Sequence, residues 1–212
     1  MKTDDLIHQL ASGASTKQSS PTLRSLALPT MLGWLFAVMI TAVFFGIRTD
    51  WASAQTAISA KTLFFASLTA AALPLVMQLC RPTTRLDGRL LLALGPVVLS
   101  LVAAVIVVAE LPGGRRMSIW IGATVPACLY LIPILALPVT CALMWQVRRY
   151  CAPTRLALAG AAIGALAGGV AGMAYALYCT FDEPAYVLSW YTTAILVSAV
   201  IGAVSGRWLL RW

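Results

Sequence analysis

The segment AGAAIGALAGGVAGMAY, residues 159–175, carries a glycine at every fourth position of an otherwise apolar stretch. Residues four apart lie on one face of an α-helix, so this face would be almost free of side chains. Small residues at this spacing let two helix backbones approach closely, which drives helix association in lipid. The segment therefore predicts a tightly packed transmembrane helix. Its repeating glycines are Gly160, Gly164, Gly168 and Gly172.

The composition of the whole chain indicates a membrane protein. Of its 212 residues, 60% are hydrophobic and 10% are charged, whereas soluble domains are about 45–50% apolar and about 25% charged. A soluble core of this size would not absorb so much apolar surface, so we expect the excess to face lipid. The net charge of +8 comes without a basic run interleaved with aromatic residues, which argues against direct nucleic-acid binding.

Six stretches are long and apolar enough to cross a bilayer, which takes roughly 20 residues. The sequence therefore predicts an all-α protein, with a six-helix transmembrane domain over residues 29–212 and an N-terminal arm over residues 1–28. We expect the fourth stretch to be kinked, because it contains three prolines. The six stretches are 29–47, 62–80, 90–110, 119–147, 157–178 and 190–209.

The distribution of basic residues predicts the orientation. With the N-terminus inside, eleven Lys and Arg residues fall on the inner side and four on the outer side. Cytoplasmic segments are enriched in these residues, so we expect both termini in the cytoplasm of a bacterium and the spans in its inner membrane. The four outer residues are Arg48, Lys61, Arg115 and Arg116.

The last apolar stretch offers a partner for the glycine face. Ser198, Gly202 and Gly206 repeat the four-residue spacing there. We favour packing of the fifth span against the sixth within one chain. A homodimer formed through the same face is the alternative.

The sequence contains no recognisable catalytic set. The predicted spans are nearly free of ionisable residues, which argues against an ion-coupled transporter. No Ser/His/Asp set, carboxylate pair or phosphate-binding glycine loop is present, and His8 is the only histidine. We therefore expect a protein that is not an enzyme, with no cofactor and no metal site.

The five cysteines divide by their predicted side of the membrane. Cys80, Cys141 and Cys151 belong to the cytoplasmic half, where thiols stay reduced, and we interpret them as small apolar helix residues. Cys128 and Cys179 share the outer, oxidising side. The sequence alone leaves open whether these two are apolar packing residues or a reactive pair.

Several segments, in order along the chain, resemble the NrsF family of six-span membrane anti-sigma factors, which regulate extracytoplasmic-function sigma factors negatively. The resemblance implies a protein that holds its sigma factor at the inner membrane until stress releases it. The segments are MKTDDLI (1–7), CLYLIPILALP (128–138), GALAGGVAGMAYALYC (164–179), WY (190–191) and GRWLLRW (206–212).

The same resemblance implies a role for two cysteines. In the family a cysteine pair is linked to the response to oxidative or heavy-metal stress, and its positions match Cys128 and Cys179. Many relatives have a histidine before the second cysteine and a proline after it, where this chain has Tyr178 and Thr180. This departure argues against direct metal coordination and leaves thiol oxidation open.

The N-terminal arm fits a sigma-factor ligand. Two aspartates would suit the first turn of a short helix, and three apolar residues would form one stripe along it. Such a helix is marginal alone and would gain stability in a partner's groove. The alternative is a disordered or lipid-bound start. The expected binding residues are Asp4, Asp5, Leu6, Ile7 and Leu10.

Two other functions remain possible from the sequence. One is a membrane thiol oxidoreductase that uses Cys128 and Cys179, although the chain has no CxxC motif. The other is a small transporter or channel, which the scarcity of charge inside the spans disfavours.

Overall fold

A computed structural model describes residues 23–80, 88–110, 113 and 127–211 of the chain. The regular elements of these residues are all helical, which confirms the predicted fold class. They are α2 (Leu23–Ile40), the π-helical turn η1 (Thr41–Phe45), α3 (Gln55–Leu79), α4 (Arg89–Glu110), α6 (Cys128–Tyr150), α7 (Leu156–Tyr175), the short α8 (Pro184–Tyr186), the π-helical turn η2 (Val187–Tyr191) and α9 (Thr192–Leu209).

Each of the six expected apolar stretches overlaps one of the long helices. Within the described residues, five segments are long and apolar enough to cross a membrane, and α4 contributes a shorter apolar segment, Leu94–Val107. The number of spans and their orientation therefore stay predictions. The five segments are Ser25–Phe45, Gln55–Leu79, Cys128–Tyr150, Leu156–Tyr175 and Pro184–Leu209.

Several helix boundaries differ from the expected ones. Helix α6 begins at Cys128 rather than at residue 119, and residues 119–126 lie outside the described part of the chain. The last span begins at Pro184, before the expected residue 190. Helix α3 begins at Gln55 instead of residue 62, so Lys61 lies inside a spanning helix and not in an outer loop.

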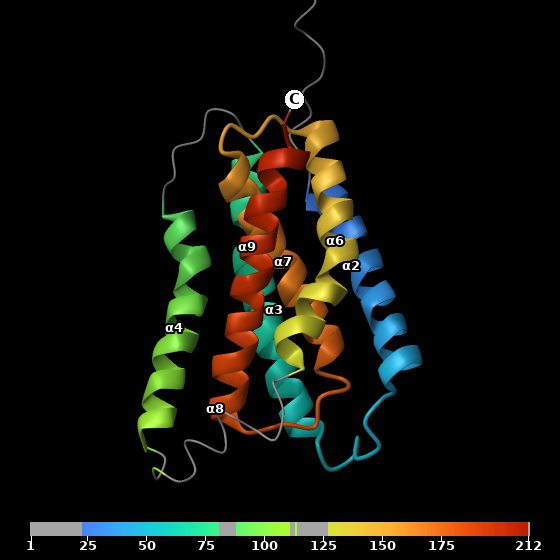
Figure 1. Cartoon of the computed structure of the whole chain (residues 1–212), viewed down its shortest axis with the longest axis vertical. Helices are drawn as coiled ribbons and strands as arrows, with labels where there is room; N and C mark the ends of the chain where they lie inside the picture. The colour runs from blue at the N-terminus through green and yellow to red at the C-terminus, as the bar shows by residue number, and fades with distance from the viewer. Residues whose placement is uncertain (1–22, 81–87, 111–112, 114–126, 212) are drawn as a thin grey trace, which may run out of the picture.

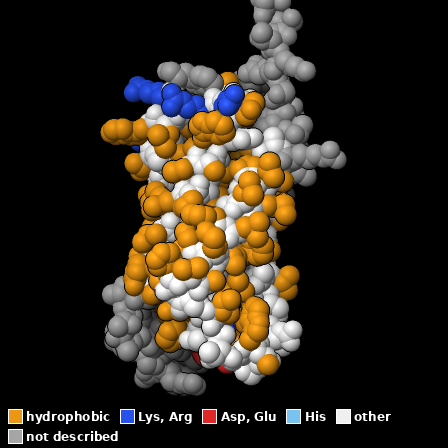
Figure 2. Space-filling model, turned by 90° about the vertical axis from the view of Figure 1, so that its right-hand side faces the viewer, with side chains coloured by type: hydrophobic (Ala, Val, Ile, Leu, Met, Phe, Trp, Pro, Cys, Tyr) orange, Lys and Arg blue, Asp and Glu red, His pale blue; other side chains and the backbone are white. Residues whose placement is uncertain are grey.

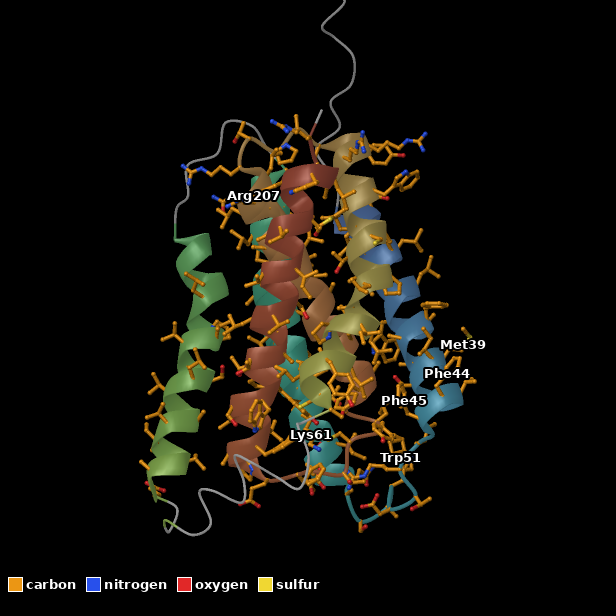
Figure 3. All side chains as sticks on the ribbon, viewed as in Figure 1. Met39, Phe44, Phe45, Trp51, Lys61 and Arg207 are labelled. Atoms are coloured by element: carbon orange, nitrogen blue, oxygen red, sulfur yellow. The ribbon has the colours of Figure 1, made fainter. Side chains whose placement is uncertain are left out.

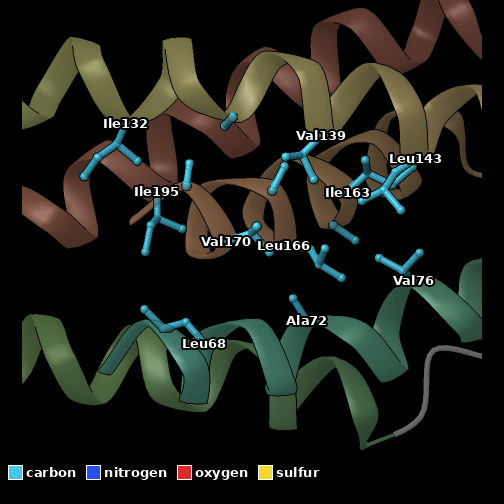
Figure 4. Close-up of a cluster of buried hydrophobic side chains, with 14 of the residues drawn as sticks. Leu68, Ala72, Val76, Ile132, Val139, Leu143, Ile163, Leu166, Val170 and Ile195 are labelled. Atoms are coloured by element: carbon cyan, nitrogen blue, oxygen red, sulfur yellow. The ribbon is translucent and has the colours of Figure 1, made fainter. Parts of the chain in front are cut away.

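Helix α7 lies at the centre of the bundle (Figure 1). It packs against α9, α3, α6 and α2, whereas α4 lies at the edge and contacts chiefly α3 and the η2 segment. The core is built on α7, where Ile163, Leu166 and Val170 meet buried side chains of α3 and α6 (Figure 4). A helix that is apolar on every side suits this central position.

The glycine face of α7 touches the backbone of α9 directly. A Cβ atom at Gly160 would overlap the carbonyl oxygen of Gly202 and lie 2.9 Å from the Cα atom of Gly206. A Cβ atom at Gly164 would overlap the carbonyl oxygen of Ser198. Gly168 lies against the Ser198 side chain, at 3.0 Å between Cβ positions. No residue larger than glycine fits the first two positions without moving a helix.

The glycine repeat does not stay on α9 along its whole length. Gly172 faces the ring of Phe65 on α3, although the spacing placed it on the same face as Gly160. A step of four residues advances about 40° around a helix of 3.6 residues per turn, so the stripe drifts toward the next neighbour. Gly169, which the sequence analysis did not single out, also packs on α3, against Thr69.

The outer surface of the bundle is largely apolar. Figure 2 shows hydrophobic side chains over most of the face on the α2 side, with Lys and Arg gathered at the end that holds the C-terminus. Large exposed apolar side chains occur on α2, as at Met31, on η1, as at Phe44, and on α4, as at Leu99 and Val105. Contiguous exposed apolar surface on this scale indicates contact with lipid.

The contact of the α7 glycines with α9 predicts that alanine lowers stability there, although alanine forms helices better than glycine. Gly164→Ala should destabilise the bundle by about 1–3 kcal/mol, because the new methyl group overlaps the α9 backbone. Gly95→Ala on α4 is the matched control: a Cβ atom there meets nothing within 4 Å, and alanine is the better helix former by about 1 kcal/mol. Unfolding midpoints of both variants in detergent check this, and a Gly164→Ala variant as stable as Gly95→Ala would contradict it.

Candidate functional site

The structure brings Cys128 and Cys179 to the same end of the bundle, opposite the C-terminus. Cys128 is the first residue of α6, and Cys179 follows the end of α7. Both are buried in one hydrophobic cluster with Tyr186 and Tyr191, and both are free thiols. This arrangement places the two expected sensing residues in a shared environment, while their role stays a prediction.

Tyrosine hydroxyls are the polar groups beside the two sulfur atoms. The Cys128 Sγ atom lies 3.6 Å from the Tyr186 Oη atom, at hydrogen-bonding distance for sulfur. The Tyr191 hydroxyl makes no hydrogen bond of normal geometry with any described residue, although the Cys179 thiol lies beside it. The Tyr191 ring stacks on Phe65 at 5.2 Å between centroids. Each thiol therefore lies beside a tyrosine that is buried in the same hydrophobic cluster.

A buried ion cluster fixes the chain on either side of Cys179. Arg48 forms two-point hydrogen bonds to Asp182, at 3.1 and 3.0 Å, and to Asp50, at 2.7 Å each. The Lys61 ammonium group lies 2.6 Å from Asp182 Oδ1. The side chains of Arg48 and Lys61 are only 2% and 3% exposed. Such burial of two cations is tolerable because two carboxylates balance them.

Both cations also hold the backbone of Cys179 itself. The Arg48 Nη1 atom donates to the Cys179 carbonyl oxygen at 3.2 Å, and the Lys61 Nζ atom donates to the same oxygen at 3.0 Å. In addition, the Arg48 backbone N–H donates to the Leu177 carbonyl oxygen at 3.3 Å. Lys61 reaches this point from the N-terminal part of α3, as Figure 3 shows. The segment after α7 is thereby tied to α3 and to the segment after η1.

The pairing shifts the ionisation of the partners outside the spans. Hydrogen bonds from Arg48 hold the pKa of Asp182 below its usual value, and they do the same for Asp50. Hydrogen bonds to Asp50 and Asp182 raise the pKa of Arg48. All three groups are therefore charged near neutral pH, as the cluster requires.

Sequence reasoning missed this cluster and misplaced one of its members. Arg48 and Lys61 were expected to be loop residues that report topology, and the spans were expected to be nearly free of charge. Arg48 does lie in the non-helical segment between η1 and α3. Lys61 is instead buried inside a spanning helix, because Asp182 neutralises it. The sequence does place opposite charges on the same predicted side of the membrane. Because these residues are far apart in the chain, no local pattern indicates that they pair.

The remaining predicted site residues fall in three places. The arm residues Asp4, Asp5, Leu6, Ile7 and Leu10 lie outside the described part of the chain. The glycines lie in the α7–α9 and α7–α3 contacts described above. Over the described ranges, no group of three or more His, Cys, Asp or Glu side chains could hold a metal ion.

The described residues form a helical membrane protein. Buried thiols, tyrosines and a cluster of paired charges lie together at one end of its helix bundle. The chain belongs to the NrsF family, described as "Negative regulator of sigma F", whose model matches residues 10–212. The match leaves out residues 1–9, which include four of the five expected binding residues of the arm.

Two curated relatives support the same assignment over their full lengths. The chain is 33% identical over 215 residues to an Azospira oryzae protein named as a probable anti-sigma-F factor NrsF. It is 32% identical over 217 residues to the anti-sigma-F factor NrsF of Caulobacter vibrioides. In both comparisons 100% of each chain is covered. No solved structure matches the chain.

The ion cluster predicts that Asp182 contributes more to the stability of the fold than the neighbouring carboxylate, Glu183. Asp182→Asn should destabilise the protein by about 1–3 kcal/mol, because charged hydrogen bonds are lost and Lys61 is left buried without a counter-charge. Glu183→Gln, at the next residue, is the matched control, since Glu183 is exposed and shows no ion pair among the described residues. Thermal unfolding in detergent measures both. Equal midpoints for the two variants would mean that the cluster does not support the fold.

Proposed function

We propose that this protein is a membrane-bound anti-sigma factor that sequesters an extracytoplasmic-function sigma factor and releases it under oxidative or heavy-metal stress. The observation that carries this proposal is the full-length similarity to two proteins named as anti-sigma-F factors. The family is regulatory by its description, in agreement with the expectation that the chain is not an enzyme.

The proposed orientation places both termini in the cytoplasm of a bacterium. At the C-terminal end of the bundle, Arg148, Arg149 and Arg155 are exposed, as is Arg207, which Figure 3 labels there. At the Cys179 end, Arg48 and Lys61 are paired with carboxylates. The uncompensated positive charge of these described residues therefore lies at one end, which supports a cytoplasmic assignment for that end.

In this orientation the arm would start on the sigma-factor side. Helix α2 begins at the end of the bundle that holds the C-terminus (Figure 1). We infer that Leu6, Ile7 and Leu10 form the apolar stripe that docks in a groove of the sigma factor, with Asp4 and Asp5 facing basic residues of the partner. The polar residues that follow the stripe act as a tether.

We infer that oxidation or a thiol-binding metal acts on Cys128 and Cys179 from the outer side. Both cysteines join helix ends, so a change at either sulfur would shift α6 or the segment after α7 relative to the tyrosine cluster. The opposite ends of α6 and α7 meet at the junction of residues 151–155, on the proposed cytoplasmic side. A tenfold weakening of sigma-factor binding needs only about 1.4 kcal/mol of coupling between the two ends.

A homodimer through the glycine faces is not part of this proposal. Gly160, Gly164 and Gly168 of α7, together with Gly202 and Gly206 of α9, already face one another within the chain. These contacts support packing within one chain over a homodimer through the same faces.

The docking role of the arm predicts a loss of retention without a loss of insertion. Leu6→Asp combined with Leu10→Asp should release the sigma factor from the membrane fraction, because charged groups would be desolvated in the groove. Ser19→Asp combined with Ser20→Asp adds the same charge in the polar tether and should leave retention intact. Fractionation and a sigma-dependent reporter measure the outcome. If the sigma factor stayed membrane-bound in the first variant, the arm model would fail.

The sensing role predicts a cysteine-specific effect on the same reporter. Cys128→Ser, Cys179→Ser and the double variant should alter basal output or abolish induction by an oxidant or by cadmium. Cys141→Ser is the control, because Cys141 is exposed on the side of α6 and lies outside the tyrosine cluster. Normal induction in the double variant, at wild-type protein abundance, would remove the sensing role from this pair.

A further inference from the structure

The outward face of α6 runs from an apolar stretch into an arginine at the end of the helix. Exposed side chains recur along α6 at steps of three or four residues, which is the spacing of one helix face. A continuous exposed face that is largely apolar lies against lipid in a membrane protein. The exposed members of this face are Tyr130, Ile134, Leu137, Cys141, Trp145 and Arg149.

The length of this face places Arg149 at the edge of the hydrocarbon layer. At about 1.5 Å per residue, the helix from Tyr130 to Arg149 is about 28 Å long. The hydrocarbon core of a bilayer is about 30 Å thick, and tyrosine and tryptophan gather at its two edges. Tyr130 lies near one edge, and Trp145 and Tyr150 lie near the other. Arg149 is therefore level with the lipid headgroups, on a side of the bundle that faces lipid.

Two aromatic rings hold the guanidinium group of Arg149. Its Cζ atom lies 5.3 Å from the centre of the Trp145 ring and 5.7 Å from the centre of the Tyr150 ring. Trp145 precedes Arg149 by about one helical turn, so the guanidinium group is turned back along α6 toward the bilayer. A cation–π contact satisfies none of its N–H donors. Within the described ranges Arg149 makes no ion pair and no hydrogen bond through its side chain.

The surroundings of Arg149 carry positive charge that no described carboxylate balances. Figure 2 shows Lys and Arg side chains gathered at this end of the bundle. The exposed arginines of the end are Arg148, Arg149, Arg155, Arg207 and Arg211. The carboxylates of the described residues lie at the opposite end, and they are Asp50, Glu110, Asp182 and Glu183.

We propose that Arg149, held by Trp145 and Tyr150, binds the phosphate group of an anionic phospholipid such as phosphatidylglycerol in the adjoining leaflet. A guanidinium group offers paired N–H donors that match two oxygen atoms of one phosphate. The neighbouring arginines favour a lipid of net negative charge over a zwitterionic lipid.

The position of Arg149 selects lipid as its partner. The headgroups lie directly against the same face of α6 whose preceding residues face the hydrocarbon. A protein that bound here would have to displace those headgroups. The site uses neither the arm nor the cysteines, so it does not rest on the proposed function.

Lipid titration of the full chain, read by native mass spectrometry, tests the proposal. The chain is purified in a neutral detergent and mixed with phosphatidylglycerol or with phosphatidylcholine of the same acyl chains. We expect tighter binding of phosphatidylglycerol. Arg149→Gln should weaken that binding about fivefold, the factor that one arginine supplies near an anionic surface, and should leave phosphatidylcholine binding unchanged. Equal affinities of the two lipids for the native chain would overturn the proposal.

Arg155→Gln is the matched control for Arg149→Gln. It removes the same charge at the same end, but Arg155 lies between α6 and α7 and contacts no ring among the described residues. Its affinity for phosphatidylglycerol should fall less than twofold. Arg149→Lys keeps the charge and loses the planar group, so its affinity should lie between those of the native chain and Arg149→Gln.

Two results would contradict the site. Equal losses of affinity in Arg149→Gln and Arg155→Gln would show that only the net charge of this end attracts lipid. Unchanged lipid binding in Arg149→Gln, together with loss of the sigma factor from the membrane fraction of cells, would assign the surface to a protein partner instead.

Discussion

The close approach of α7 and α9 is the contact on which the rest of the structure depends. In lipid, apolar side chains gain little by leaving their surroundings, so helix association relies on packing and backbone proximity. Gly160 and Gly164 bring the two backbones together until no side chain fits between them. This contact fixes α7 at the centre, and α3, α6 and α2 then pack around it. Cys128 and Cys179 lie at ends of helices that this arrangement holds in place.

The Cys179 end adds a second constraint of a different kind. A cation buried at the edge of a bilayer is costly unless a counter-charge and hydrogen bonds accompany it. Asp182 supplies both to Arg48 and Lys61, and the two cations in turn hold the Cys179 carbonyl oxygen. The segment that carries this cysteine is therefore fixed by charge on one side and by aromatic packing on the other. A chemical change at its thiol would act on a rigid support and not on a free loop.

The sequence predicted those features that depend on local pattern. Hydropathy identified the long helices, and the four-residue glycine repeat identified the α7 face that meets α9. The pattern failed at Gly172, because a repeat of four drifts around the helix, and at Lys61, because its partner Asp182 lies far along the chain. The spacing of residues in the sequence predicts which of them share a face of one helix. Which residues pair between helices depends on the complete fold.

A cross-link between α7 and α9 is the sharpest test of their close approach. Gly168→Cys combined with Ser198→Cys places two thiols where the Cβ positions are 3.0 Å apart, close to the separation of about 3.5–4.5 Å found in disulfides. Mild oxidation of the dilute chain in lipid nanodiscs, followed by peptide mass spectrometry, identifies the products. We expect an intramolecular disulfide between the two introduced cysteines in a monomer. A link found only between two copies, or formed as readily by Ser198→Cys alone, would contradict it.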